Sequence, residues 1–172
     1  MTRGYVHVYT GDGKGKTTAA IGLAIRAAGA GMRVFIAQFV KGMHYNELDA
    51  LDRYAAQITL KQYGRDCFIK NEPTQQDIQA ALHGLEEVKR ILASGDYQMV
   101  ILDEANVATW YNLFSADELV DLVRSKPDSV ELVITGRNAD PKVIAAADLV
   151  TEMKEIKHYY HRGVQARPGI ET

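Results

Sequence analysis

One stretch near the amino end constrains the fold of this chain more than any other. An apolar run at 5–9 leads into a glycine-rich segment at 10–15, and a helical pattern then opens with Lys16 and Thr17. A strand, a glycine-rich turn and a helix N-terminus in this order aim backbone N–H groups and the positive end of a helix at one anion. The stretch therefore predicts a loop that cradles nucleotide phosphates.

The residues of this loop have separate tasks. Its alternating glycines let successive amides face one anion, Lys16 adds a point charge, and the Thr17 hydroxyl suits Mg²⁺. The strict pattern begins with glycine, whereas Thr10 holds that position here. An ordinary glycine-rich turn is the alternative, and Lys14 is equally compatible with a solvated loop lysine. The predicted nucleotide-binding residues of the loop are Thr10, Gly11, Asp12, Gly13, Lys14, Gly15, Lys16, Thr17 and Thr18.

The composition excludes several broad classes of protein. With 172 residues, 47% of them hydrophobic, the chain suits one domain spanning 1–172 and is too short for two. Its 20 basic and 22 acidic residues favour neither a nucleic-acid nor an anionic-membrane partner. Cys67 is the only cysteine, which excludes an internal disulfide. Because the sequence has no membrane-spanning run and no secretory signature, we expect a cytoplasmic protein.

Six apolar runs alternate with helical patterns along the chain. Such runs predict strands that are buried on both faces, as in a parallel sheet with crossover helices. We therefore predict an α/β fold of three layers, with a mostly parallel central sheet of about six strands and helices on both faces. The predicted strands span 5–9, 34–40, 58–62, 99–102, 131–135 and 149–153.

Local signals predict several helices between these strands. The clearest helix begins after Thr74 and stops near Gly95. Capping patterns at 115–118 and 140–141 predict two further helix starts. The apolar face of the first helix is predicted to contain Ile78, Ala81, Leu82, Leu85, Val88 and Leu92.

Two irregular stretches, 41–48 and 63–72, follow predicted strand ends. In open α/β sheets, ligands bind outside the carboxyl ends of the strands. These stretches are therefore candidate walls for a second substrate.

An acidic pair supports a metal ion beside the loop. The apolar run at 99–102 ends in Asp103 and Glu104, at the tip of a predicted buried strand. A carboxylate in this position typically reaches Mg²⁺ directly or through water. Helix capping is the alternative for either residue. The predicted metal ligands are Thr17, Asp103 and Glu104.

The fate of the nucleotide is left open by these residues. A phosphotransferase or hydrolase needs a group that orients the attacking oxygen, often with an arginine to stabilise charge. Arg137 follows another strand and is predicted near the phosphates, although a simple turn is equally consistent. Arg26, in the helix after the loop, is predicted to meet the nucleotide, with a solvent-facing position as the alternative.

At this point the sequence resembles a known family. The stretch 9–20 is similar to the opening of the ATP:corrinoid adenosyltransferases of the CobA/CobO/BtuR type, whose loop also departs from the strict pattern at the position of Thr10. The resemblance implies a RecA-like P-loop NTPase fold. Further blocks that look like those of the family lie in order at 38–42, 102–104, 133–137, 147–153, 157–158 and 163–171.

The resemblance implies transfer of the 5'-deoxyadenosyl group of ATP to the cobalt(I) of a reduced corrinoid, with release of triphosphate. The acceptor would be cob(I)yrinic acid a,c-diamide, cobinamide or cobalamin. Cobalt(I) is itself the nucleophile, so the chemistry needs no general base. Lys16, the loop amides and Mg²⁺ on Thr17 and Glu104 would hold the leaving triphosphate.

The resemblance also implies an apolar pocket that excludes a lower axial ligand. The cobalt then stays four-coordinate, which makes the reduction of cobalt(II) easier. Members that act on cobalamin carry a Phe-x-Trp pair where this chain has the segment 64–69, which lacks tryptophan. Phe68 is predicted as the catalytic substitute, with Cys67 and Ile69 as lesser candidates and ordinary loop packing as the alternative. Further candidate corrinoid contacts, with core or surface positions as alternatives, are Trp110, Tyr111, His44 and Tyr45.

The partners follow from the same resemblance. They are ATP and the corrinoid, an electron-donating reductase and a second copy of the chain in a homodimer. In some members an amino-terminal extension covers the corrinoid; here the second copy would supply that cover, and a missing cover is the alternative. A basic tail either docks on the protein or contacts the corrinoid or triphosphate, through Lys157, His158, Arg162 and Arg167. The alternative functions are a RecA-like ATPase or small-molecule kinase, and a nucleotide-dependent corrinoid carrier.

Overall fold

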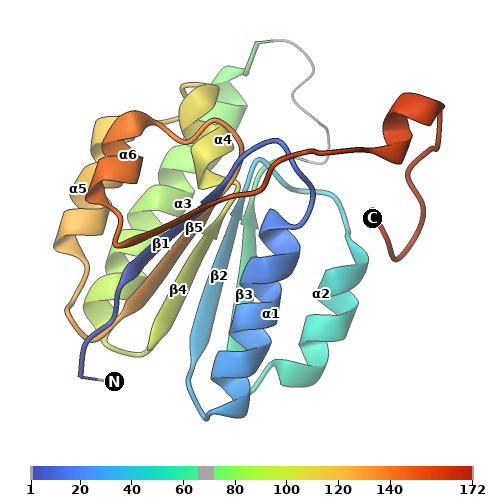
Figure 1. Cartoon of the computed structure of the whole chain (residues 1–172). Helices are drawn as coiled ribbons and strands as arrows, with labels where there is room; N and C mark the ends of the chain where they lie inside the picture. The colour runs from blue at the N-terminus through green and yellow to red at the C-terminus, as the bar shows by residue number, and fades with distance from the viewer. Residues whose placement is uncertain (1, 66–71, 172) are drawn as a thin grey trace.

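A parallel sheet forms the centre of the molecule, in a computed structural model that describes residues 2–65 and 72–171 (Figure 1). Its strand order is β3-β2-β4-β5-β1-β6, and every neighbouring pair is parallel. The predicted α/β fold with a sheet of about six strands is confirmed. The strands are β1 Val6–Thr10, β2 Val34–Phe39, β3 Ile58–Tyr63, β4 Met99–Asp103, β5 Glu131–Thr135 and β6 Leu149–Glu152.

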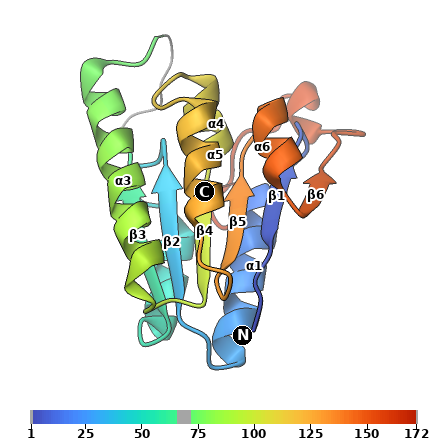
Figure 2. The same cartoon turned by 90° about the vertical axis from the view of Figure 1, so that its left-hand side faces the viewer.

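Helices cover both faces of this sheet. Helices α3, α4, α5 and α6 lie on one face (Figure 2), and α1 and α2 lie on the other (Figure 1). The α-helices are α1 Lys16–Gly29, α2 Asn46–Leu51, α3 Gln75–Ser94, α4 Ala105–Trp110, α5 Ala116–Ser125 and α6 Pro141–Ala146, and the two 3-10 turns are η1 Asp52–Tyr54 and η2 Tyr159–Arg162.

The central strands are buried because their side chains are apolar on both sides. Every residue of β2 and β4 is buried. Alternate residues point to opposite faces, so Phe35 packs in the core on the α3 side while Ile36 packs in the core against α1. On α1 the buried face is mostly alanine, including Ala20 and Ala24, which allows the helix to lie close to the sheet. The sheet is thus a rigid frame for the loops at its carboxyl edge.

Local capping determines where the predicted helices begin and end. The Thr74 hydroxyl accepts from the Asp77 N–H, and the Asp77 carboxylate accepts from the Thr74 N–H, which closes a capping box at the start of α3. The helix stops before Gly95, whose φ of +74° is in the left-handed region. α5 begins with the same box at 115–118, and α6 begins with an aspartate cap and a first-turn proline at 140–141. All three predicted starts are confirmed.

One predicted core position of α3 is wrong. Leu82 is 37% exposed, whereas Ala81 and Leu85 are buried. The helix instead approaches β3 at Gly84, where a Cβ atom would lie 2.5 Å from Cγ of Tyr63. The absence of a side chain at Gly84 makes room for the tyrosine ring.

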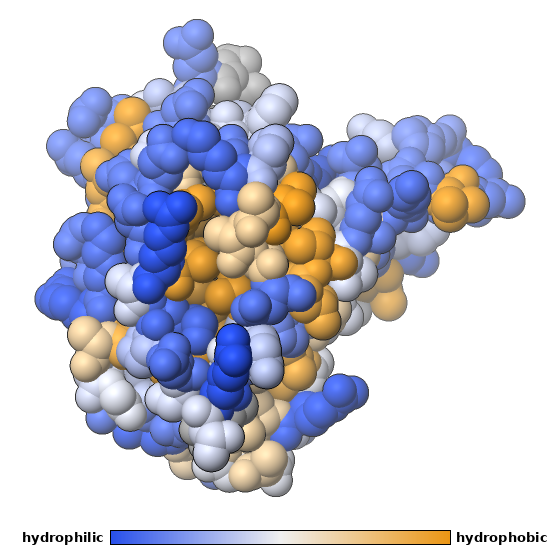
Figure 3. Space-filling model, turned by 60° about the vertical axis from the view of Figure 1, so that its left-hand side comes forward, coloured by the Kyte–Doolittle hydropathy of each residue, from blue (hydrophilic) through white to orange (hydrophobic). Residues whose placement is uncertain are grey.

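Two other expectations differ from the structure. All four residues of β6 are exposed, and β6 is an edge strand that pairs only with β1. Burial on both faces is therefore wrong for this strand, where Leu149 and Val150 are more than two-fifths exposed. Exposed apolar side chains also occur as a group on the molecular surface, among hydrophilic ones, on the face turned forward in Figure 3. The predicted irregular stretch 41–48 is also shorter than expected, because α2 already begins at Asn46.

Among the residues that the structure describes, none of the helices has both the length and the apolar character needed to cross a membrane.

Candidate functional site

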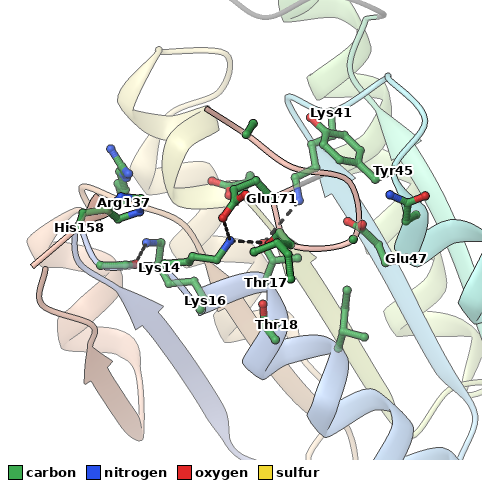
Figure 4. Close-up of a pocket in the computed structure, with 18 of the residues that line it drawn as sticks. Lys14, Lys16, Thr17, Thr18, Lys41, Tyr45, Glu47, Arg137, His158 and Glu171 are labelled. Atoms are coloured by element: carbon green, nitrogen blue, oxygen red, sulfur yellow. Dashed lines mark hydrogen bonds and ion pairs between the residues drawn. The ribbon is translucent and has the colours of Figure 1, made fainter. Parts of the chain in front are cut away.

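A cavity of about 850 Å³ opens at the carboxyl edge of the sheet, where the loop after β1 meets the loop after β2 and the carboxyl-terminal segment. Figure 4 shows Arg137 and His158 on the side opposite Lys41 and Tyr45, with the loop between them. The residues that line the cavity are Asp12, Gly13, Lys14, Gly15, Lys16, Thr17, Thr18, Ile21, Lys41, Tyr45, Asn46, Glu47, Ala50, Glu104, Arg137, His158, Ala166, Gly169, Ile170 and Glu171.

The loop at 10–15 brings the N-terminus of α1 to this cavity. Gly15 is the N-cap of the helix with a φ of +118°, and no side chain caps the first turn. Close packing explains two other glycines, because a Cβ atom at Gly11 or Gly13 would lie 2.5 or 2.7 Å from the carbonyl oxygen of Met153. The helix N-terminus therefore faces the cavity with amides suited to an anion.

Lys16 is the buried cation of the loop. Its Nζ donates to the carbonyl oxygens of Gly11 at 2.7 Å and Gly13 at 2.8 Å, and the residue is 7% exposed. Burial lowers the pKa of the Lys16 ammonium, and the Arg137 guanidinium lowers it further. A polyanion in the cavity would relieve both effects, because it offers the ammonium a counter-charge.

Asp103 accepts four side-chain hydrogen bonds at the tip of β4. Its Oδ1 accepts from Thr17 Oγ1 at 2.8 Å and from Thr135 Oγ1 at 2.7 Å. Its Oδ2 accepts from Lys41 Nζ at 2.8 Å and from Gln38 Nε2 at 3.2 Å. This network ties the ends of three neighbouring strands to the first turn of α1.

Glu104 is held in an unusual backbone conformation beside Asp103. Its φ of +60° is in the left-handed region, which a non-glycine residue adopts at a cost and mostly at functional sites. Burial raises the pKa of its carboxyl, and the Asp103 carboxylate raises it further. Within the described residues, the Glu104 side chain accepts no hydrogen bond. Its carboxylate therefore lines the cavity with its lone pairs available to a ligand.

The oxygens of Thr17, Asp103 and Glu104 fit a hard divalent cation. The described residues contain no group of three or more histidine, cysteine, aspartate or glutamate side chains arranged to hold a metal ion by themselves. Mg²⁺ commonly takes one or two carboxylates together with substrate phosphates and waters, and does not need a complete protein cage. The donor set is therefore consistent with an ion that arrives with a nucleotide.

Arg137 reaches the cavity from the turn after β5. Gly136 precedes it with a φ of +128°, and a Cβ atom there would lie 3.0 Å from Cβ of Asn106. Asn106 Nδ2 donates to the Gly136 carbonyl oxygen at 3.3 Å, which holds the turn against α4. The structure thus brings Arg137 to the predicted phosphate loop.

The structure does not bring Arg26 to the cavity. Arg26 lies in the last turn of α1 and is exposed. It lies ten positions after Lys16 along the α-helix, a rise of about 15 Å. Thr10 and Gly11 also do not line the cavity. The Thr10 hydroxyl accepts from the Ala139 N–H at 3.3 Å, and the Gly11 carbonyl oxygen accepts from Lys16 Nζ, so both residues support the loop. A glycine at position 10 would lack the contact with Ala139.

The candidate corrinoid contacts separate into different environments. Tyr45 lines the cavity, whereas His44 Nε2 lies 3.0 Å from the Asp49 carboxylate outside it. Trp110 is 62% exposed at the end of α4, so the core position considered for it is wrong. Neither Trp110 nor Tyr111 lines the cavity. The predicted catalytic Phe68 and its neighbours Cys67 and Ile69 lie outside the described residues.

The carboxyl-terminal segment docks on the phosphate loop. Lys14 Nζ donates to the carbonyl oxygen of Ile170 at 2.6 Å and lies 3.4 Å from Glu171 Oε1. The Arg167 guanidinium, followed by the Tyr159 hydroxyl, lowers the pKa of the Glu171 carboxyl to about 2. The contacts of the tail with the loop are made by Ile170 and Glu171, whereas Arg167 of the predicted basic block bonds Glu171 within the tail. His158 is the member of the basic block that lines the cavity.

Several residues of the site were missed in the sequence. Gln38 is fully buried in an otherwise apolar strand, and Lys41 and Thr135 bind Asp103. Polar residues at the carboxyl ends of buried strands were the available signal. Glu171 was missed because its contact with Lys14 spans almost the whole chain.

Comparison with known proteins gives one consistent result. The family model described as ATP:corrinoid adenosyltransferase BtuR/CobO/CobP matches residues 2–172. The chain is 34% identical to a corrinoid adenosyltransferase of Pseudomonas aeruginosa over 170 residues, which cover 98% of this chain and 84% of the relative. It is 35% identical to the corrinoid adenosyltransferase of Escherichia coli K12 and 34% identical to corrinoid adenosyltransferase CobA of Salmonella typhimurium, covering 98% of this chain and 86% of each relative.

Proposed function

Because this chain belongs to the ATP:corrinoid adenosyltransferase family and uses ATP to adenosylate a corrinoid, we propose that the cavity at its phosphate loop holds the triphosphate of ATP as the leaving group. In this reaction the cobalt(I) of the reduced corrinoid attacks C5' of the ribose. A cobalt–carbon bond forms, the C5'–O bond breaks, and the electron pair leaves on the triphosphate. No proton has to be removed from the nucleophile.

The observation that carries this proposal is the charge around the cavity. At the phosphate loop the cationic side chains of Lys16 and Arg137 meet the N-terminus of a 14-residue helix. Lys14 and Lys41 also border the cavity but are paired with Glu171 and Asp103. The acidic residues of the lining are Asp12, Glu47, Glu104 and Glu171. A triphosphate gains charge as it leaves, and preorganised cations stabilise that developing charge most strongly where water is scarce. We assign Lys16 and the loop amides to the triphosphate, with Arg137 as a further cationic contact.

The carboxylates have a second task in the proposal. Thr17, Asp103 and Glu104 would hold Mg²⁺, which when bound supplies further positive charge to the leaving triphosphate. Asp103 already bonds Thr17, so it also orients the threonine hydroxyl. Glu104 follows Asp103 at the tip of β4, lines the cavity and accepts no hydrogen bond from the described side chains, so it is proposed as a direct ligand.

The acceptor and the cellular setting are also part of the proposal. We propose cob(I)yrinic acid a,c-diamide, cobinamide or cobalamin as the acceptor, in cobalamin biosynthesis. The chain is proposed to form one domain and to work in the cytoplasm as a homodimer supplied with electrons by a reductase. Likeness to the family supports these assignments.

Product analysis tests the function. The protein is incubated with ATP, Mg²⁺ and chemically reduced cobinamide or cobalamin, and the products are followed by the cobalt–carbon absorbance spectrum and by anion-exchange chromatography. We expect adenosylated corrinoid and triphosphate in equal amounts. ADP and phosphate formed without corrinoid would indicate an ATPase, and corrinoid binding without either product would indicate a carrier.

Phe68 gives a separate prediction for the corrinoid half of the site. Phe68→Ala is expected to slow the reduction of bound cobalt(II) corrinoid about tenfold or more, because a lost aromatic wall admits an axial ligand. ATP affinity is expected to be unchanged. Stopped-flow reduction and calorimetric titration measure the two effects, and an unaltered reduction rate would assign the apolar wall to another residue.

A further inference from the structure

Lys41 lies between the residues that are proposed to bind the cation. Its Nζ is 2.8 Å from Asp103 Oδ2 and 3.5 Å from Thr17 Oγ1. Its side chain is 15% exposed, and that of Asp103 is 2% exposed. The ammonium also lies 5.3 Å from the ring centroid of Tyr45, which lines the same cavity. The ammonium of Lys41 is therefore a partly buried cation that contacts two of the three proposed ligands, Asp103 and Thr17.

The backbone is built to bring Lys41 to this position. Val40 has a φ of +62°, which is strained for a β-branched residue and turns the chain sharply after β2. The next segment packs backbone to backbone against the end of β3. A Cβ atom at Gly42 would lie 2.4 Å from the backbone of Arg65, and one at Gly64 would lie 2.5 Å from the Lys41 N atom. Strain and close packing together fix where the side chain begins.

An ammonium and a divalent cation compete for these oxygens. The Thr17 hydroxyl donates its proton to Asp103 Oδ1, and the lone pairs of the same hydroxyl oxygen accept from Lys41 Nζ. Those lone pairs and Asp103 Oδ2 are the same atoms that a hard cation would need. Two positive charges on one buried carboxylate repel strongly, so binding of a divalent ion favours a different position for the ammonium.

We propose that Lys41 acts as an internal stand-in for the divalent cation in the nucleotide-free site, and that the arriving cation turns its ammonium onto the polyphosphate of the bound nucleotide. The flexible four-carbon stem of lysine permits this movement while the backbone stays fixed. Asp103 is then never left as an unpaired buried charge, and the leaving triphosphate gains one more cation. Lys41 is a positioning residue in the first state and a phosphate contact in the second. The second half of this inference rests on the proposed function.

The test uses Mn²⁺ and inorganic tripolyphosphate as separate probes. Mn²⁺ binding to the nucleotide-free protein is measured by electron paramagnetic resonance, and tripolyphosphate binding in the presence of Mg²⁺ is measured by calorimetry. Lys41→Met removes the competing ammonium, so Mn²⁺ is expected to bind about tenfold tighter than to the wild type, while tripolyphosphate binds about tenfold more weakly. Lys41→Arg retains the positive charge, so its affinities for Mn²⁺ and for tripolyphosphate are both expected to stay close to those of the wild type.

Matched controls separate this account from a structural role. Lys61→Met removes an exposed lysine on β3 that bonds Glu87, and neither affinity is expected to change. If Lys41→Met unfolds, Lys41→Gln replaces it, since glutamine still donates to Asp103 without charge. Mn²⁺ affinity equal to or weaker than that of the wild type would overturn the proposal. Failure of adenosyl transfer in the product assay would overturn the proposed function and leave the Mn²⁺ result standing.

Discussion

Lys16→Met is expected to reduce adenosyl transfer at least about a thousandfold, because the leaving triphosphate loses its buried cation in the loop. The substitution keeps much of the apolar stem, so the packing of the side chain is largely retained. The lysine Nζ donates to the carbonyl oxygens of two loop residues, Gly11 and Gly13. These contacts hold the ammonium where phosphates are proposed to bind.

Single-turnover formation of the cobalt–carbon bond measures this effect without a contribution from product release. Circular dichroism and thermal unfolding establish that the variant is folded. The matched control is Lys14→Met, which removes a lysine that contacts Ile170 and Glu171 at the cavity, and a much smaller loss is expected. A Lys16→Met rate within tenfold of the wild type would contradict the assignment of this lysine to the leaving group.

Asp103→Ala is expected to lower the free energy of unfolding by about 3–5 kcal/mol, because breaking a buried ion pair leaves an uncompensated charge. The variant leaves the Lys41 ammonium without its carboxylate and three neutral donors without their acceptor. Urea unfolding followed by circular dichroism measures the change. The same variant is expected to lose Mg²⁺-dependent binding of tripolyphosphate.

A surface ion pair provides the control for this prediction. Asp117 bonds Lys142 at 2.7 Å, but both side chains are more than three-fifths exposed. Asp117→Ala is expected to leave the free energy of unfolding almost unchanged, as is usual for solvent-exposed pairs. Equal losses in the two variants would mean that burial and the shared network add nothing to the stability contributed by Asp103.

The elements that follow from local sequence were the predictable part of the fold. The central strands are β-branched and apolar, so they were recognisable without knowledge of their neighbours. The α3 start at Thr74 and its end at Gly95 depend on capping contacts within a few residues. The exposure of β6 was not predictable from its composition, because Leu149 and Val150 are apolar and yet exposed, and the covering of an edge strand by other elements depends on the tertiary fold.

In the candidate site, too, the contiguous motifs were predictable and the contacts that depend on tertiary packing were not. The phosphate loop and the acidic pair are contiguous motifs, and the structure brings them together through the bond from Thr17 to Asp103. The contact between Lys41 and Asp103 depends on a left-handed turn at Val40 and on packing against Gly64, neither of which has a local signature. The exclusion of Arg26 could have been predicted from the sequence, because the helical rise along α1 already places it far from the phosphate loop.

The central claim is that the cavity holds a leaving triphosphate and that the C5'–O bond of ATP breaks. Turnover of ATP labelled with ¹⁸O at the oxygen that bridges C5' and the first phosphorus, with mass spectrometry of the products, tests it most directly. The account predicts that the label leaves entirely in triphosphate and that the adenosylated corrinoid carries none. Label retained in ADP or another adenosine phosphate, with no labelled triphosphate, would contradict it.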